Sequence, residues 1–162
     1  MKTFNYKFIK YILVCLSFTI FSCSKNYIKT YESYNEYKIL NPDEFLNKSN
    51  NDYLIYVYSE YCPPCRDLKN EVFNLLDTKP NNFYIYDVTN ISDSDLYKFK
   101  LFDETKTKEE MKLEMINKSN IKDIYLVQTP SIYSINNRGL LTDVEFNYTN
   151  IQNIIFGLKN NK

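Results

Sequence analysis

The tetrapeptide Cys62-Pro63-Pro64-Cys65 constrains this chain more than any other feature. It follows an uninterrupted aromatic and β-branched run, Tyr53–Tyr58, and it opens an amphipathic run that extends to residue 76. The spacing predicts a redox-active dithiol at a turn from a strand into a helix. Unpaired N–H groups at the start of a helix stabilise a thiolate, which is the reactive form of cysteine. Cys62 is therefore the predicted nucleophile, and Cys65 is its resolving partner.

The composition removes several classes of function. The chain has 162 residues, enough for one domain, and its 20 basic and 20 acidic side chains balance. A net charge of zero gives no electrostatic reason to expect a nucleic acid partner. The absence of histidine excludes His-based catalysis, His metal ligands and a Cys-His nucleophile pair. Of the four cysteines, at positions 15, 23, 62 and 65, only the last two lie in the predicted folded domain.

The first 22 residues have the layout of a secretory signal peptide. Three lysines precede an uncharged apolar run at 11–21, which is short for a membrane span of ~20 residues. The segment 20–24 (Ile-Phe-Ser-Cys-Ser) resembles a bacterial lipoprotein processing site, so we expect lipidation of Cys23. The alternative is an incidental cysteine near an ordinary cleavage site. With the anchor, residues 23–40 would form a tether or an early strand on the extracytoplasmic face of a bacterial membrane.

Residues 41–162 are predicted to form one α/β domain, which begins with a helix, a strand and a second helix. A helix capped by Asn41, with Pro42 at its first position, is expected to end near residue 50. The run Tyr53–Tyr58 suits a strand that is buried on both faces. The amphipathic helix after Cys65 is expected to end near residues 79–80, before a second central strand at 83–88.

The second half of the domain is predicted to be helical and then to form a hairpin. Residues 89–118 are expected to be helical in two pieces, with the charge-rich centre 103–112 as a solvated face or loop. Strands at 131–135 and 140–146 flank a turn, and a closing amphipathic helix covers 150–158. This order implies a central mixed sheet with helices on both faces.

Two segments together resemble the signatures of the thioredoxin superfamily. Residues 53–66, which contain the dithiol, resemble its active-site strand and turn. Residues 129–139 (Thr-Pro-Ser-Ile-Tyr-Ser-Ile-Asn-Asn-Arg-Gly) resemble its second signature, in which a cis proline faces the dithiol. The likeness covers roughly residues 40 to 160. It implies a thioredoxin-like fold with a helical insertion between the active-site helix and the cis-Pro motif, because the stretch between the motifs is longer than in minimal thioredoxin.

The resemblance also implies a substrate groove. Pro130 would shape the groove, and the backbone of Thr129 would pair with an incoming peptide as a short added strand. Tyr61 stands where the family usually has tryptophan, and it would keep an aromatic wall beside Pro63 and Pro64.

The partners and cofactors follow from the same resemblance. The chain is similar to the extracytoplasmic, membrane-tethered thiol-disulfide oxidoreductases and to the thioredoxin-like accessory proteins of bacterial secretion systems. Its partners would be protein thiols or disulfides, with a membrane electron donor as a further candidate. A monomer is expected, and the redox-active disulfide Cys62–Cys65 would serve without any cofactor.

One departure from the family concerns proton transfer. Thioredoxin holds a buried Asp six residues before its first active-site cysteine, where it helps proton transfer to the resolving thiol, and this chain has Tyr56 there. Glu60, Asp67 or water are the candidates for that role. For each of the two carboxylates the alternative is a solvated surface charge.

The two prolines favour one direction of electron flow. Pro63 and Pro64 have no N–H groups, so mainly the Cys65 N–H is left to hydrogen-bond the Cys62 sulfur. A less stabilised thiolate lowers the reduction potential of the pair, which favours a disulfide reductase or isomerase over a strong oxidase.

Three functions stay open at this point. The first is a thiol-disulfide oxidoreductase. The second is a non-catalytic binding module that keeps the fold and uses the groove to hold a secretion or assembly partner. The third, a thiolate metal site, is the weakest, because two cysteines without histidine cannot complete a tetrahedral zinc site in one chain without carboxylates. We therefore expect no metal.

Overall fold

The computed structural model describes residues 40–79 and 81–160. The predicted signal peptide (1–22), the lipidation site Cys23 and the tether up to residue 39 lie outside the described residues. Within those two ranges, no helix has both the length and the apolar character that a membrane span requires. Leu40 is buried, and its N–H donates to the carbonyl of Ile85 at 2.9 Å.

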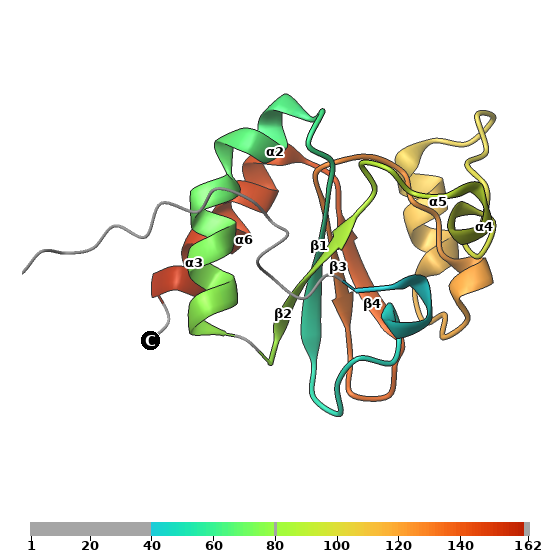
Figure 1. Cartoon of the computed structure of the whole chain (residues 1–162). Coiled ribbons are helices and arrows are strands. Elements are labelled where there is room, and N and C mark those ends of the chain that lie inside the picture. Colours follow the sequence, from blue (N-terminus) through green and yellow to red (C-terminus); the bar gives the residue numbers. More distant parts are fainter. Residues whose placement is uncertain (1–39, 80, 161–162) are drawn as a thin grey trace, which may run out of the picture. The chain divides into compact units, whose positions relative to one another are not determined.

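Four strands form one mixed sheet in the described part of the chain (Figure 1). They are β1 (Tyr53–Tyr58), β2 (Phe83–Asp87), β3 (Ser131–Ile135) and β4 (Leu141–Glu145), and their order across the sheet is β2-β1-β3-β4. β1 is parallel to β2 and antiparallel to β3, and β3 is antiparallel to β4. Val57 pairs with Ser131. The carboxyl end of β1 and the start of β3 therefore meet at one edge of the sheet.

Helices cover both faces of this sheet (Figure 1). After β1 the chain crosses over through α2 (Pro63–Asp67) and α3 (Lys69–Thr78), because a parallel neighbour cannot be reached by a hairpin. α3 packs beside the C-terminal helix α6 (Tyr148–Asn160) on one face. The other face carries short elements: η2 (Pro42–Glu44), α4 (Asp93–Leu96), α5 (Lys108–Met115) and η3 (Ile121–Asp123).

The central strand β1 holds the two layers together. Ile55 and Val57 enter the core on the side of α5, whereas Tyr56 and Tyr58 enter the core on the side of α3 and α6. All four side chains are buried. Each large apolar side chain removed from water contributes about 1.5–3 kcal/mol, so this strand stabilises both layers at once. The prediction of a strand that is buried on both faces is confirmed.

The predicted helix at 41–50 is wrong beyond its first turn. The structure has the predicted cap at Asn41, but only the 3-10 turn η2 follows it. The Tyr53 hydroxyl donates to the Phe45 carbonyl and accepts from the Lys48 N–H, at 3.2 Å each. These are backbone groups that a longer helix would pair within itself. A tertiary contact therefore ends the helix early.

The helix predicted after the dithiol is also divided. α2 ends at Asp67 and α3 begins at Lys69, with Leu68 between them at φ −88° and ψ −5°. Leu68 is buried in the core under α3, so the change of direction serves packing. The strand at 131–135 is confirmed as predicted, and the bounds of the later strands and of α6 differ from prediction by a residue or two.

The segment between β2 and β3 is less helical than predicted. Of residues 89–118, only α4 and α5 form α-helices, and an irregular stretch at 97–107 separates them. The predicted division into two pieces is confirmed, but residues 108–112 of the expected charged loop form the start of α5. That this segment is an insertion relative to thioredoxin stays a prediction.

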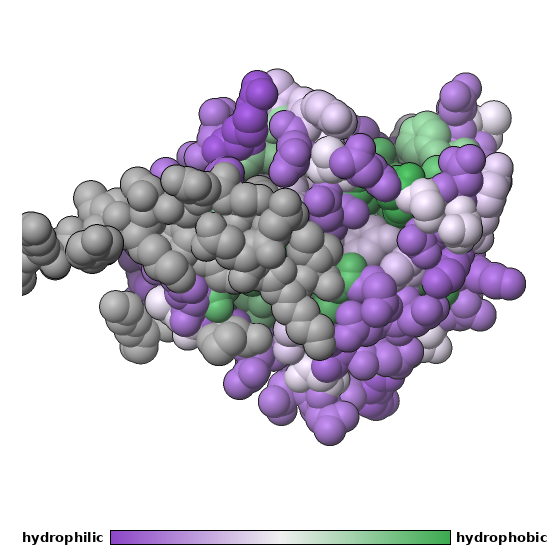
Figure 2. All heavy atoms as spheres, in the orientation of Figure 1, coloured by the Kyte–Doolittle hydropathy of each residue, from purple (hydrophilic) through white to green (hydrophobic). Residues whose placement is uncertain are grey.

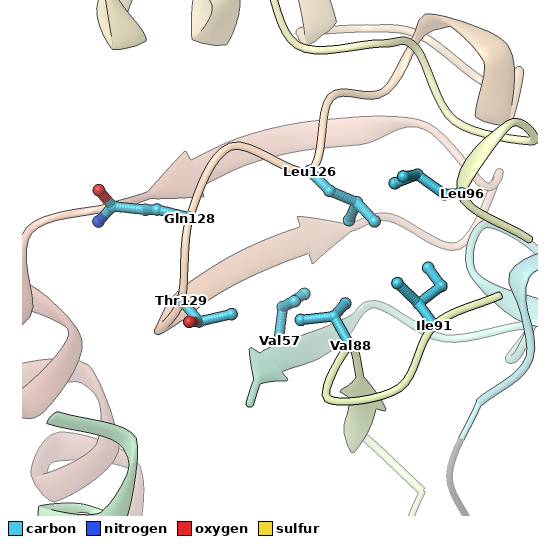
Figure 3. A pocket seen from close by; sticks show the side chains of 7 residues that line it. All are labelled: Val57, Val88, Ile91, Leu96, Leu126, Gln128 and Thr129. Carbon is cyan, nitrogen blue, oxygen red and sulfur yellow. The ribbon is translucent and has the colours of Figure 1, made fainter. Parts of the chain in front are cut away.

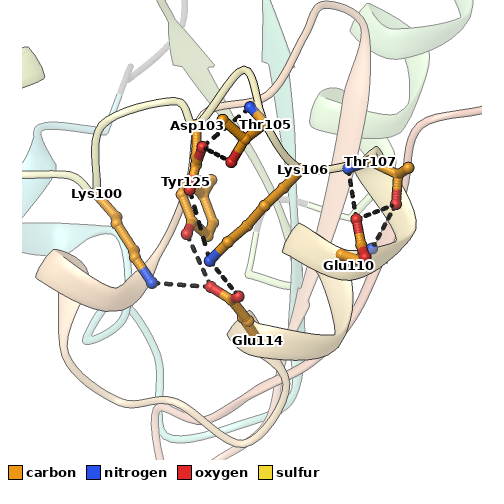
Figure 4. Close-up of polar contacts among 8 residues, drawn as sticks. All are labelled: Lys100, Asp103, Thr105, Lys106, Thr107, Glu110, Glu114 and Tyr125. Carbon is orange, nitrogen blue, oxygen red and sulfur yellow. Dashed lines mark hydrogen bonds and ion pairs between the residues drawn. The ribbon is translucent and has the colours of Figure 1, made fainter.

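A network around Glu114 ties the irregular stretch to α5 (Figure 4). The Glu114 carboxylate pairs with Lys100 at 2.9 Å and with Lys106, and it accepts a hydrogen bond from the Tyr125 hydroxyl at 2.8 Å. Hydrogen bonds from Lys106, Lys100 and Tyr125, in that order of weight, lower the pKa of Glu114 to about 2. Ion pairs and hydrogen bonds thus hold the stretch 97–107, which lacks regular secondary structure.

The arrangement is the thioredoxin-like α/β fold that the sequence predicted. Its sheet order is that of a parallel β-α-β unit joined to an antiparallel hairpin, with a helix after the hairpin. The dithiol lies at the start of α2, directly after β1. The Thr129–Pro130 peptide bond is cis, as expected, and it directly precedes β3.

Candidate active site

The dithiol occupies the first turn of α2. Cys62 is the N-cap residue, with extended backbone at φ −86° and ψ 111°, and the Cys65 N–H donates to the Cys62 sulfur at 3.2 Å. The two sulfurs are joined in a disulfide, and the Cα atoms lie 5.2 Å apart. Pro63 and Pro64 occupy the two positions between them, where an N–H would have no partner inside the helix. The donor to the Cys62 sulfur is the one that the sequence predicted.

The two cysteines differ in access to solvent. Cys62 is 8% exposed and Cys65 is 1% exposed. Pro63 and Tyr61 beside them are exposed, and Tyr61 has 76% of its surface in solvent. A disulfide is attacked at the sulfur that can be reached. Cys62 is therefore the more accessible of the two cysteines, and Cys65 is the more buried one.

A chain of hydrogen bonds fixes the loop that precedes Cys62. The Tyr58 hydroxyl donates to one oxygen of Asp87 at 3.0 Å, and the Thr89 N–H donates to the other at 2.7 Å. The Thr89 hydroxyl then accepts from the Glu60 N–H at 2.9 Å. Closer to the dithiol, the Cys62 N–H donates to the Ser59 carbonyl at 3.1 Å.

The sequence analysis missed Asp87 and Thr89. A usable signal existed, since polar residues that follow a strand parallel to β1 must lie at the same edge of the sheet as the dithiol turn. These two residues hold the loop and do not touch either sulfur in any contact of the described residues.

The cis-Pro segment lies at the same edge of the sheet. Its register places Ser131 opposite Val57, so Thr129 and Pro130 come next to the end of β1. The Gln128 side chain donates to the Phe146 carbonyl and accepts from Lys108, and the Ser131 hydroxyl donates to the Gln128 carbonyl at 2.9 Å. The segment is thus attached to Phe146, the residue after β4, and to α5 as well as to β3.

A mostly apolar pocket of about 300 Å³ opens beside Thr129 (Figure 3). Figure 3 shows the aliphatic side chains of β1, of the loop after β2, of α4 and of the cis-Pro segment converging on it, while Gln128 points away. The apolar lining residues are Val57, Val88, Ile91, Leu96 and Leu126. The volume is sufficient for one large apolar side chain.

The surface beyond this pocket is also apolar in part. Figure 2 shows hydrophobic side chains in solvent at the α4–α5 end of the molecule. The large exposed hydrophobic residues of this region are Leu96, Tyr97, Leu101, Phe102 and Leu113. Leu96 belongs to both sets, so it lines the pocket and is also exposed to solvent.

The candidates for proton transfer lie in different places. Glu60 and Asp67 are both exposed, but Glu60 lines a pocket with Cys65, whereas Asp67 does not. Tyr56, at the position where thioredoxin has Asp, is buried in the same apolar cluster as the two cysteines and stacks on Tyr58 with ring centroids 6.4 Å apart.

Among residues 40–79 and 81–160, no three side chains of the His, Cys, Asp or Glu types gather closely enough to hold an ion. The arrangement can instead perform thiol chemistry: an outer sulfur with one N–H donor, an inner sulfur within bonding distance, and an apolar pocket at the same edge of the sheet.

No known protein-family model and no curated protein matches this chain. Among solved structures, the chain is similar to mitochondrial thioredoxin 3 from Saccharomyces cerevisiae in its oxidized form, with 21% identity over 76% of this chain and 97% of that one, at a TM-score of 0.46. It is also similar to thioredoxin f from spinach chloroplast, with 11% identity over 75% and 85% of the two chains and a TM-score of 0.44. Thioredoxin O2 from Arabidopsis thaliana, in the oxidized state, has 13% identity over 74% and 91% and a TM-score of 0.38.

Proposed function

We propose that this protein is a thiol-disulfide oxidoreductase that uses Cys62 and Cys65 to exchange electrons with thiols and disulfides of other proteins. One observation carries the proposal: the more exposed sulfur caps α2 and accepts a hydrogen bond from the Cys65 N–H, while the second sulfur is bonded to it and buried. A purely structural disulfide does not need its outer sulfur at a helix start, where a thiolate is stabilised.

The reaction transfers two electrons. In the reduced protein the Cys62 thiolate attacks a substrate disulfide, forms a mixed disulfide and releases one substrate sulfur as a thiolate. Cys65 then loses its proton and attacks the Cys62 sulfur, the bond between Cys62 and the substrate breaks, and the second substrate thiolate leaves. The protein ends as the Cys62–Cys65 disulfide, and a dithiol donor must reduce it again.

The hydrogen bonding of the Cys62 sulfur favours reduction or isomerisation of disulfides over strong oxidation. The Cys65 N–H is its donor in the structure, and the two prolines offer none. A reduced form with one N–H donor is less stabilised than one with several, so the pair gives up electrons more readily. A measured reduction potential near that of a strong periplasmic oxidant would overturn this direction.

Protein substrates fit the site better than small thiols do. The apolar pocket beside Thr129 can take one large side chain of a peptide whose backbone pairs with Thr129. Leu96, which lines this pocket, is also exposed to solvent, so an apolar contact can continue outside the pocket.

Insulin reduction tests the proposal. The full chain in detergent, with dithiothreitol as the electron source, is expected to speed the precipitation of insulin chains, and Cys62→Ser is expected to fall to the uncatalysed rate. If the wild type is as inert as Cys62→Ser, the non-catalytic binding module replaces the enzyme. Cys65→Ser cannot resolve a mixed disulfide, so in cells it is expected to stay covalently joined to its protein partner.

The place of action is a separate proposal. The lysine-rich start, the apolar run and Cys23 favour export and a lipid anchor on the extracytoplasmic face of a bacterial membrane. Cys23→Ala is expected to move the protein from the membrane fraction to the soluble fraction after cell breakage. Unchanged retention would exclude the anchor and leave the redox proposal intact.

A further inference from the structure

A second pocket lies on the inner side of the dithiol. It has a volume of about 270 Å³ and is lined by Ser59, Glu60, Cys65, Arg66 and Lys69. It shares no lining residue with the apolar pocket beside Thr129. Cys65 is its only sulfur-bearing lining residue. Apart from Cys65, its lining residues carry polar or charged side chains, and it is large enough for water, so it can connect the buried cysteine with the solvent.

Cys65 needs such a connection when a mixed disulfide is resolved. The attacking form is the thiolate, so the Cys65 proton has to leave as the sulfur attacks. Cys65 is 1% exposed and lies in an apolar cluster with Tyr56 and Leu68. Charged groups are costly in such surroundings. The proton therefore needs an acceptor near the side of Cys65 that opens to the pocket.

The surrounding elements offer few acceptors. On α2 and α3, Arg66 and Lys69 are cations, and Asp67 is exposed and does not line the pocket. On β1, Tyr56 and Tyr58 carry phenols, which ordinarily stay protonated near neutral pH. Asp87 on β2 is engaged by the Tyr58 hydroxyl and by Thr89. Glu60 is thus the one carboxylate among the residues that line the pocket.

That carboxylate belongs to Glu60, and the loop that carries it is held in place. The Glu60 N–H donates to the Thr89 hydroxyl at 2.9 Å, and Thr89 in turn donates to Asp87 through its N–H at 2.7 Å. The backbone from which the Glu60 side chain extends is therefore anchored to the end of β2. Arg66 and Lys69 line the same pocket as Cys65, and a cation beside a thiol favours its thiolate form as the proton leaves.

We propose that Glu60 is the proton acceptor for Cys65, through water in this pocket, and so performs the task for which thioredoxin uses a buried Asp. As the Cys65 sulfur bonds to the Cys62 sulfur, its proton passes by water to the Glu60 carboxylate. The electron pair of the bond between Cys62 and the substrate leaves with the substrate sulfur. The inference rests on the proposed oxidoreductase function and adds a residue to it.

A single-turnover experiment separates the two steps. The reduced full chain, carrying Cys15→Ser and Cys23→Ser so that only the dithiol reacts, is mixed with a symmetrical nitroaryl disulfide that releases a coloured thiolate. The first release reports attack by Cys62, and the second reports resolution by Cys65. Both are followed over a range of pH.

In Glu60→Gln the second release is expected to slow by roughly 10²-fold at neutral pH, which is the scale of one general base. The deficit is expected to shrink as the pH rises towards about 8.5, where a thiol ionises without help. The first release is expected to be unchanged. Glu60→Asp should recover part of the lost rate, because it restores the carboxylate.

Asp67→Asn is the matched control, since it removes a neighbouring carboxylate that does not line the pocket, and both of its releases should match the wild type. The inference is overturned if Glu60→Gln resolves at the wild-type rate at every pH, if it slows both releases equally, or if Asp67→Asn slows the second release as much. Insulin turnover keeps the two proposals distinct. If the wild type reduces insulin but Glu60→Gln leaves the second release unchanged, only the proton route is contradicted. If the wild type fails to reduce insulin, the proposed oxidoreductase function is contradicted.

Discussion

On the dithiol side of the sheet, α3 and α6 contribute 10 and 13 helical residues, whereas on the opposite side η2, α4, α5 and η3 contribute 3, 4, 8 and 3. The first side packs mainly aliphatic residues under two long helices. The second side packs aromatic rings edge to face, with Phe45 in contact with Tyr86, Phe99 and Tyr133 at centroid distances of 5.3 Å.

The difference separates two tasks within one sheet. The reactive sulfurs belong to the side that is built from regular helices, which position them through backbone geometry. The apolar pocket and the exposed hydrophobic surface belong to the side that is built from short elements. Under the proposed function, chemistry would lie on the more regular side, and contact with substrates would lie on the side where loops can vary.

The largest test of this division is Phe45→Ala. Phe45 is fully buried at the centre of the aromatic cluster, so its truncation is expected to lower the free energy of unfolding by about 3–5 kcal/mol. Urea denaturation followed by circular dichroism measures this loss. The first release of coloured thiolate by the protein that remains folded is expected to keep its rate, and a slower release would mean that the two sides are not separate.

A smaller effect is expected at two glycines, one on each side. Gly139 has φ +73°, and a Cβ there would lie 2.6 Å from the Leu46 carbonyl oxygen, so Gly139→Ala is expected to destabilise by about 1–3 kcal/mol. Gly157 lies in α6, and a Cβ there would meet nothing within 4 Å, so Gly157→Ala is expected to stabilise by about 0.5–1 kcal/mol.

Thermal melts of the two glycine variants check the signs. A lower melting midpoint for Gly139→Ala and a higher one for Gly157→Ala would support the division. The first side would then depend on a close backbone contact at a turn, and the second on a regular helix. Shifts in the same direction would contradict the division.

The smallest effect is expected for Glu114→Gln, and it depends on pH. The pKa of Glu114 is lowered from 4.5 to about 2 in the folded protein, mainly by Lys106 and then by Lys100 and Tyr125. A depressed carboxyl pKa stabilises the folded state above the unfolded pKa, and this contribution is lost as the pH falls through the folded value. The melting midpoint of the variant should thus lie below that of the wild type at neutral pH, by a few degrees at most because the group is solvent-exposed.

As the pH falls from 4.5 towards 2, the two midpoints of wild type and Glu114→Gln should converge. Melts at low salt measure this difference. A gap that stays constant over that range would show that the network does not act through the charge of Glu114.

The parts of the fold that follow from short-range pattern could be predicted. The run Tyr53–Tyr58 has no polar interruption, so adjacent residues alone predict the strand and its burial on both faces. The turn at Cys62 could be placed because cysteine spacing and an amphipathic run coincide there. Pro130 could be placed only through a family likeness, since nothing within the chain itself says which proline lies at the dithiol edge.

The parts of the fold that depend on partners distant in the sequence could not be predicted. The helix expected from residue 41 stops because the hydroxyl of Tyr53, eight residues after Phe45, takes its carbonyl. The stretch at 97–107 has charges that suit a solvated face, and no local pattern says that Lys100 and Lys106 meet one carboxylate from α5. The hydrogen bond from the Glu60 N–H to the Thr89 hydroxyl joins two loops, and no periodic sequence pattern predicts a bond of this kind.

The pairing of Val57 with Ser131 has a consequence for how this protein can change over evolution. The dithiol and Pro130 are aligned by one antiparallel ladder, so their separation is set by strand register and not by the length of the chain between them. The irregular stretch 101–107, which has no buried residue, can therefore gain or lose residues at the small cost of closing a longer or shorter loop. New surfaces for new substrates could be grafted there while the chemistry at Cys62 stays unaltered.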